Sequence, residues 1–91
     1  MLFEFDQKKN ESNIKNNDVS FEEARAIWED PDLLVLPAKK KGEKRQLAIG
    51  KDYAVVFSAI PSKRGAAIWI TSARRATAKE VELYEQSKNR R

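Results

Sequence analysis

The sequence predicts an α+β fold, an antiparallel β-meander with N-terminal helices and a C-terminal helix. Three observations lead to it. Helix signals come first along the chain, between residues 6 and 30. Strand-like runs with short connections then occupy residues 33–73, and a last helix signal follows residue 77. Helices segregated from a run of antiparallel strands are typical of the α+β class.

The length and composition bound the kind of protein. The chain has 91 residues, so we expect residues 1–91 to form a single domain. It has no cysteine and no histidine, which excludes a disulfide framework, thiol chemistry and histidine-based catalysis. No apolar run approaches the roughly 20 residues that cross a bilayer, and the first ten residues do not resemble a signal peptide. We therefore expect a cytoplasmic protein.

The first helix is preceded by a strand signal and has an unusual composition. The run LFEF at residues 2–5 predicts an edge strand, and Asp6 can cap the following helix through its carboxylate. That helix, over residues 7–17, is rich in asparagine and has one large apolar residue, Ile14. We expect it to depend on packing or on a partner.

The second helix has clearer signals. Ser20 and Glu23 form a capping box at its start, and Asp30-Pro31 ends it. Apolar residues at helical spacing predict a buried stripe, formed by Phe21, Ala24, Ile27 and Trp28. Trp28 belongs to the core by this spacing, and the alternative is an aromatic that stacks on a nucleobase.

Residues 33–37 predict a short strand, and three further strand-like runs, at residues 45–50, 53–60 and 66–73, predict the meander. We expect turns at residues 51–52 and 61–65. The basic run AKKKGEKR at residues 38–45 is either a solvated hairpin tip or a loop that contacts phosphate.

The last helix begins with a second capping box. Thr77 stands at the cap position and Glu80 three residues later. Val81 and Tyr84 are expected to face inward, because they share one side of the helix.

Charge is unevenly distributed along the chain. Residues 1–37 have four basic and nine acidic side chains, a net of −5, whereas residues 38–91 have fourteen and five, a net of +9. The basic part fits a polyanion. The acidic part lies away from that ligand or meets a basic partner. The alternative is a dipolar surface without a ligand.

Two adjacent arginines, Arg74 and Arg75, stand between the last strand and the capped helix. The planar guanidinium matches phosphate geometry, and the amides at a helix N-terminus also favour anions. Neighbouring residues on an extended backbone point to opposite faces, so one arginine can grip a phosphate while the other pairs elsewhere. A strand that simply ends in arginine is the alternative.

The meander also predicts how the basic clusters are arranged. Alternate turns of a meander lie at the same end, so residues 38–45 and 61–65 should lie together. Arg74 and Arg75 should lie at the other end, where they could meet side chains of a neighbouring strand or Lys51. If the polyanion is RNA, a 2′-hydroxyl can attack the neighbouring phosphorus, and arginine can stabilise the charge that develops. A lysine with a lowered pKa could accept the proton. Other proton carriers are Glu43, Glu80, Tyr53 and Tyr84, and no spacing chooses among them.

Three blocks of the sequence match a family pattern. FEFDQKKNESNIKNNDVSFEEA resembles F-E-W-D-x-x-K-x-x-x-N-x-x-K-H-G-V-S-F-E-E-A, the middle block fits E-x-R-x-x-x-I-G, and the last block resembles I-I-S-A-R-R-A-T-x-x-E-x-x-x-Y-E. The matching positions are Phe3, Glu4, Asp6, Lys9, Asn13, Val19, Ser20, Phe21, Glu22, Glu23, Ala24, Glu43, Arg45, Ile49, Gly50, Ile70, Ser72, Ala73, Arg74, Arg75, Ala76, Thr77, Glu80, Tyr84 and Glu85. On these blocks the chain resembles the BrnT family of type II toxins, whose fold is similar to that of RelE.

The resemblance implies a ribonuclease toxin that cuts RNA and stops translation, with no metal or organic cofactor. It also implies a BrnA-type ribbon-helix-helix antitoxin, and an assembly that is a dimer of toxin–antitoxin pairs. Arg45, Arg74 and Arg75 are the positions carried over as active-site residues. We add as RNA-binding candidates Lys44, Lys51, Lys63, Arg64 and Tyr84.

The sequence departs from the family pattern at one triplet. Lys-His-Gly of the pattern is Asn16-Asn17-Asp18 here. If the histidine serves catalysis or RNA binding in relatives, this chain is a catalytically weakened homologue that acts as an RNA- or antitoxin-binding module. If the histidine only packs at the helix end, asparagine can replace it.

Overall fold

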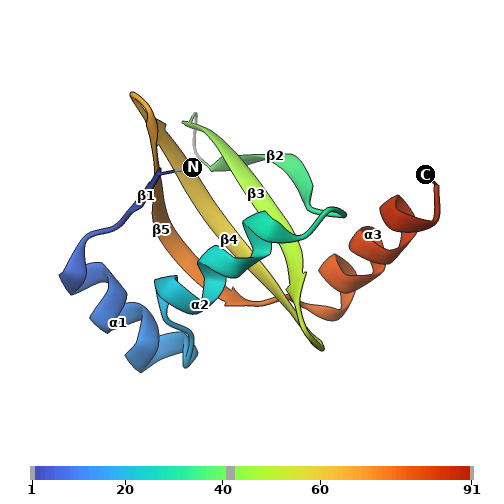
Figure 1. Ribbon diagram of the computed structural model, residues 1–91, viewed down its shortest axis with the longest axis horizontal. Coiled ribbons are helices and arrows are strands. Elements are labelled where there is room, and N and C mark those ends of the chain that lie inside the picture. Colours follow the sequence, from blue (N-terminus) through green and yellow to red (C-terminus); the bar gives the residue numbers. More distant parts are fainter. Residues whose placement is uncertain (1, 41–42, 91) are drawn as a thin grey trace.

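The computed structural model describes residues 2–40 and 43–90. It confirms the predicted α+β class, with a five-stranded sheet in the order β1-β5-β4-β3-β2 (Figure 1). Strands β2 to β5 form the antiparallel meander, and β1 adds to the edge of β5 in parallel. The elements are β1 (Leu2–Glu4), α1 (Gln7–Asn17), α2 (Phe21–Arg25), the 3-10 turn η1 (Ala26–Glu29), β2 (Leu34–Lys40), β3 (Glu43–Asp52), β4 (Val55–Arg64), β5 (Ala67–Arg75) and α3 (Ala78–Asn89).

The caps predicted from the sequence are present in the structure. The Asp6 carboxylate accepts from the backbone N–H of Lys8 at 2.8 Å. Both capping boxes form, Ser20 with Glu23 and Thr77 with Glu80, so each of these helices begins where its signal predicts.

Helix α1 packs on the rest of the molecule through asparagines. Asn10 and Asn13 are buried, whereas Ile14 remains 43% exposed. The Asn10 side-chain oxygen accepts from the backbone N–H of Phe21 at 2.8 Å. The expected dependence of this helix on packing is therefore met by polar side chains that satisfy backbone groups of neighbouring segments.

The strands are longer than predicted, and the expected turns at 51–52 and 61–65 are wrong. Residues 51–52 belong to β3, and the chain turns at Tyr53-Ala54 with Tyr53 at φ 55°. Lys63 and Arg64 belong to β4, and Gly65 at φ 60° makes the turn. The ladder continues through these charged residues because pairing is between backbone groups, whatever the side chains.

The basic run at residues 38–45 also consists mostly of strand. β2 continues to Lys40 and β3 begins at Glu43, with Lys39 level with Lys44. The tip of this hairpin lies outside the described residues. The prediction of a loop is therefore wrong for residues 38–40 and 43–45.

The two faces of the sheet are covered by different helices. Phe57, Ala59 and Ala73 face α1 and α2, where they form the main core with Phe21 and Ile27. Figure 1 shows α2 crossing the front of the sheet and α3 projecting from its β3 side. Residues of the alternate register face the other way, and α3 packs against this second face near Ile49 and Ser58, with Tyr84 buried.

Gly50 permits η1 to lie close to β3. A Cβ at this position would lie 2.6 Å from the Ile27 Cβ, closer than two carbon atoms can pack. Position 50 therefore favours glycine, because η1 packs so closely on β3 there that a side chain has no room.

Candidate functional site

A hollow lined by four basic side chains lies between residues of α1, β3, β4 and β5. Its volume is about 670 Å³, and Lys9, Arg45, Lys63 and Arg64 contribute to its wall. Hydroxyl groups of Ser62 and Thr71 lie in the same wall. Among the described residues, no aspartate or glutamate lines it. We call these four basic residues the cationic hollow.

The sheet register explains why these residues meet. β3 and β4 run antiparallel, so the first residues of β3 lie beside the last residues of β4. The predicted neighbourhood of Arg45 with residues 61–65 is therefore confirmed. The Arg64 guanidinium lies 4.8 Å from the centre of the Trp69 ring, a cation–π contact that favours this position of the exposed side chain.

Lys9 is a member that the charge analysis missed. It stands in the acidic N-terminal part of the sequence, and α1 brings it to the hollow. Its place in the first family block was the signal that could have identified it. Lys44 is adjacent to Arg45 in β3, and its side chain lies outside what the structure describes.

Arg74 lies at the opposite end of the sheet and is held by Glu80. Its two terminal nitrogens donate to the two carboxylate oxygens at 2.5 and 2.9 Å. The Arg74 side chain keeps 43% of its surface exposed, against 12% for Glu80. The guanidinium is therefore fixed in direction and still open on one side.

The environment of Glu80 keeps it ionised. Hydrogen bonds from Arg74 lower the pKa of Glu80 to about 2, with burial opposing them and the backbone N–H of Thr77 and the Ser58 hydroxyl adding to them. The same pair raises the pKa of Arg74. A carboxylate with so low a pKa is a weak base near neutral pH, which argues against Glu80 among the candidate proton acceptors.

Arg75 lies on the other face of the same strand. Arg74 is level with Ser58, and Arg75 is level with Phe57. The Arg75 side chain is exposed and has no hydrogen-bond or ion-pair partner within residues 2–40 and 43–90. The two neighbouring arginines thus divide as the extended backbone predicts, one paired and one available.

Two asparagines of α1 fix the backbone just before these arginines. Asn13 Nδ2 donates to the Ala73 carbonyl at 2.7 Å, and Asn13 Oδ1 accepts from the Ala73 N–H at 3.2 Å. Asn17 Nδ2 donates to the same carbonyl at 3.0 Å and to Asn13 Oδ1 at 3.1 Å. Asparagine at position 17 therefore has a positioning contact of its own in this chain.

Two of the candidate RNA-binding residues lie apart from the cationic hollow. Tyr84 is 1% exposed, and its hydroxyl donates to Asp30 Oδ2 at 2.6 Å. Burial first, and this hydrogen bond next, raise the pKa of Tyr84. Its ring cannot stack on a base from this position, so we do not retain it as an RNA contact. Lys51 lines a separate hollow beside Tyr53 and Lys88.

The arginines on the face away from α2 form two groups along one surface. Arg45 and Ile49 share a face of β3, and Ile49 is level with Ser58 and therefore with Arg74. Four residues of strand separate Arg45 from Ile49, which is about 13 Å along the sheet. A chain of successive phosphates, but not a single phosphate, can contact both groups.

Neither a metal cluster nor a membrane span is present in the described part of the chain. No three aspartate or glutamate side chains converge there as a metal-ion site. None of the helices is both long enough and apolar enough to cross a bilayer.

A small α+β domain with arginines and lysines displayed at two places on its sheet is a candidate polyanion-binding protein. A comparison with family models identifies the family within this class. The model described as "Ribonuclease toxin, BrnT, of type II toxin-antitoxin system" matches residues 5–80. The chain therefore belongs to the BrnT family of ribonuclease toxins. A comparison with curated proteins found no matching relative.

Proposed function

We propose that this protein is an endoribonuclease toxin that cuts RNA in the cytoplasm without a metal ion and thereby inhibits translation. Its family supports the ribonuclease class. The observation that favours this chain's own activity is the cationic hollow, because four basic side chains line it and none of its described lining residues is acidic. Such a site attracts a polyanion more strongly than isolated surface charges do.

The proposed reaction is attack of a 2′-hydroxyl oxygen on the adjacent phosphorus. The P–O bond to the 5′-oxygen breaks, the 2′-oxygen loses its proton, and the leaving oxygen gains one. Arg45, Arg74 and Arg75 are the proposed catalytic residues: either Arg45 or the Arg74/Arg75 pair would stabilise the negative charge on the phosphoryl oxygens of the cleaved phosphate. The other group would bind a neighbouring phosphate of the same chain. Lys44, Lys51, Lys63 and Arg64 would bind flanking phosphates, with Lys9 added from its place in the hollow.

The arginines would have different tasks. Arg74 is pre-oriented by Glu80, so its guanidinium would present a fixed edge to a phosphate. Arg75, which is exposed, can reorient towards the substrate. Positive charge supplied by arginine would take the part that a metal ion takes in other nucleases.

The protein partner would be an antitoxin. A type II system implies a protein that neutralises the toxin. We propose a BrnA-type ribbon-helix-helix antitoxin and an assembly that is a dimer of toxin–antitoxin pairs.

Growth of cells that express this chain alone tests the toxin proposal. We expect arrest with the unaltered chain, and relief of arrest with Arg74→Ala/Arg75→Ala and with Arg45→Ala. Lys15→Ala is the matched control, since Lys15 is an exposed basic residue outside the hollow and should leave arrest unchanged. Arrest that survives all the arginine changes, with soluble protein present, would contradict the proposal.

A second candidate function is an RNA- or antitoxin-binding module without cleavage. Asn17 in place of the family's histidine favours it, because asparagine has no titratable group. It predicts RNA binding without cleavage and restored activity in Asn17→His. Cleavage by the unaltered chain would exclude it.

A further inference from the structure

We propose that the groove between β1 and the α2–η1 segment binds an extended, basic segment of a partner protein, in which lysine or arginine alternates with apolar residues. The proposal rests on the proposed function, because a type II toxin has a protein partner. It adds the surface at which that partner binds and the chemistry of the segment.

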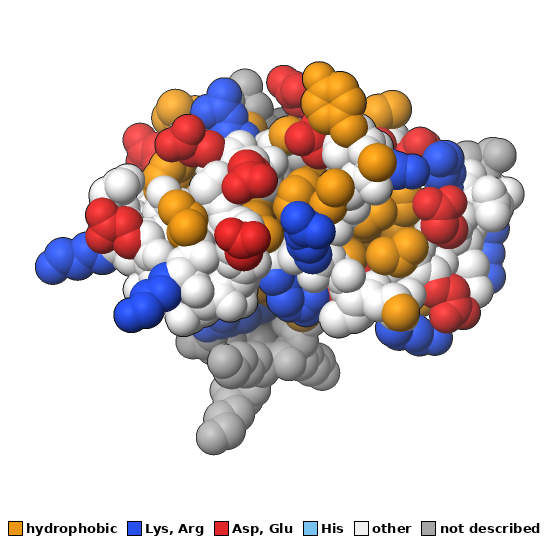
Figure 2. Space-filling model, turned by 90° about the horizontal axis from the view of Figure 1, so that it is seen from below, with side chains coloured by type: hydrophobic (Ala, Val, Ile, Leu, Met, Phe, Trp, Pro, Cys, Tyr) orange, Lys and Arg blue, Asp and Glu red, His pale blue; other side chains and the backbone are white. Residues whose placement is uncertain are grey.

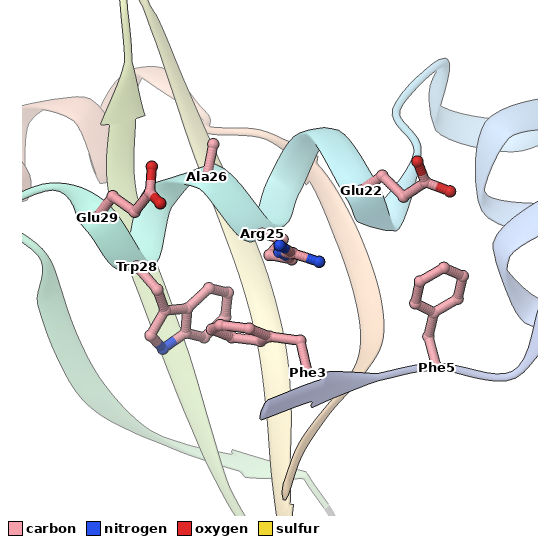
Figure 3. Close-up of a pocket in the computed structure, with 7 residues that line it drawn as sticks. All are labelled: Phe3, Phe5, Glu22, Arg25, Ala26, Trp28 and Glu29. Carbon is pink, nitrogen blue, oxygen red and sulfur yellow. The ribbon is translucent and has the colours of Figure 1, made fainter. Parts of the chain in front are cut away.

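The groove has an aromatic floor. Its volume is about 710 Å³, and Phe3, Phe5 and Trp28 contribute rings to it. Figure 3 shows the Phe3 ring extending from β1 to lie beside the Trp28 ring, and the Phe5 ring, just after β1, pointing towards the helix. The Phe3 and Trp28 rings meet edge to face, with their centres 5.2 Å apart. All three rings are only partly buried, so each has apolar surface that an incoming side chain can cover.

The helical side of the groove is acidic. Glu22 and Glu29 stand towards its two ends, on either side of Arg25 (Figure 3). Both glutamates are exposed, and neither has an ion-pair partner within the described residues. The Arg25 guanidinium lies 5.7 Å from the centre of the Phe3 ring. Two carboxylates are thus available above apolar rings, an arrangement complementary to a segment with basic and apolar side chains.

The acidic and aromatic character continues past the groove. A second hollow shares Ala26 and Glu29 with it and adds Asp32, Asp52 and the Tyr53 ring, which is 95% exposed, although Lys51 and Lys88 also line it. Figure 2 shows acidic and apolar side chains interspersed over the lower end of the molecule, with basic ones between them. Protein interfaces likewise combine apolar and aromatic side chains at the centre with polar and charged ones at the rim.

The edge of β1 favours an extended occupant. β1 pairs with β5 on one side, and it is the last strand of the sheet. The backbone groups on its other side can pair with an added strand. In an extended segment that lies along the groove, successive side chains point to opposite sides, so apolar residues would reach the rings beside β1 while basic residues approach Glu22 and Glu29 on the helical side.

The occupant is a protein segment and not RNA. The carboxylates of Glu22 and Glu29 repel phosphate, whereas the cationic hollow is lined by other residues altogether. The two surfaces can therefore bind ligands of opposite charge on one small domain.

The test uses defined peptides and the full-length chain. A fluorescein-labelled peptide of alternating lysine and leucine is titrated with the unaltered protein and with Glu22→Lys/Glu29→Lys, and binding is followed by anisotropy. We expect the double charge reversal to weaken binding by about tenfold. A peptide with glutamate in place of each lysine should not bind. In a Trp69→Phe background, the fluorescence of Trp28 should change when the lysine peptide binds.

The matched control is Glu11→Lys/Glu82→Lys, which makes the same charge change at two exposed glutamates outside the groove. We expect it to change the affinity by less than about twofold. Equal weakening by both double variants, equal binding of the glutamate peptide, or no binding by the unaltered protein would overturn the proposal. RNA cleavage is measured on the same proteins: its absence from the unaltered chain would count against the proposed function, while the peptide result decides the groove.

Discussion

Arg74 and Arg75 are adjacent in the sequence and differ in every contact. Arg74 makes a paired hydrogen bond to Glu80 and stays partly open, whereas Arg75 is exposed on the opposite face. The alternation of an extended strand could be predicted, and it placed one arginine on each side. The sequence did not identify Glu80 as the partner of Arg74, because the capping box with Thr77 already accounted for a glutamate at that position.

Removal of the Glu80 charge should reduce stability in a pH-dependent way. The pKa of Glu80 falls from 4.5 to about 2 on folding, so its charge stabilises the fold above pH 4.5 and that stabilisation is lost as the pH falls towards 2. We expect Glu80→Gln to lower the free energy of unfolding by about 2 kcal/mol at pH 7, after allowing for the solvent exposure of Arg74. The difference between the two proteins should disappear near pH 2.

Urea unfolding at several pH values measures this difference. Glu82→Gln is the control, because it removes the same charge from an exposed position of the same helix. A difference between unaltered protein and Glu80→Gln that did not change from pH 7 to pH 2 would show that the ion pair is not its cause.

Asn13 shows a limit of sequence patterns at the residue scale. Helical periodicity searches for apolar residues, and in α1 it finds only Ile14, which is exposed. Asn13 is buried because its amide satisfies both backbone groups of Ala73 and also donates to the Val19 carbonyl at 2.7 Å. The Asn13 side-chain amide pairs with the backbone of Ala73 as a neighbouring strand would. The spacing of residues along α1 does not predict this pairing.

At the scale of elements, the caps were predictable and the strand ends were not. A capping box is a local pattern of two residues, so Ser20 and Thr77 mark helix starts correctly. The end of a strand depends on how long its neighbour continues to pair. The charged residues of 61–64 therefore looked like a turn, although they lie in β4.

The end of α1 permits a test of backbone strain. Asp18 terminates the helix at φ 57°, a left-handed conformation that glycine adopts at less cost, and the family pattern has glycine at this position. We expect Asp18→Gly to raise the free energy of unfolding by about 0.5–1 kcal/mol. Loss of a negative charge at a helix C-terminus acts in the same direction.

The control for this prediction is Lys15→Gly, one turn earlier in the same helix. There the backbone is helical, so glycine should lower stability by about 0.7 kcal/mol. Thermal unfolding of the three proteins measures both effects. Equal destabilisation by the two substitutions would contradict the strain assigned to Asp18.

At the scale of the whole molecule, the cationic hollow is formed mainly by the basic part of the sequence, and the groove beside β1 is formed by the acidic part. The cationic hollow draws Arg45, Lys63 and Arg64 from the basic part and Lys9 from the acidic part. The meander predicted that Arg45 would lie near residues 61–65 and away from Arg74, which the register confirms. The burial of Tyr84 was predicted from the helical spacing of α3, and it keeps the ring from RNA. Its partner Asp30 could not be predicted, because it is 54 residues earlier in the chain.

The central claim is the proposal that this chain cleaves RNA and that Arg45, Arg74 and Arg75 stabilise the charge that develops in the reaction. The most direct measurement is cleavage of a labelled single-stranded RNA by the purified chain in the presence of a metal chelator. Unaltered protein should yield products with a 2′,3′-cyclic phosphate end, and Arg45→Ala or Arg75→Ala should reduce the rate by about 10²-fold or more while the fold is retained. Cleavage that proceeded at an unchanged rate in both variants, or no cleavage by the unaltered chain, would contradict the account.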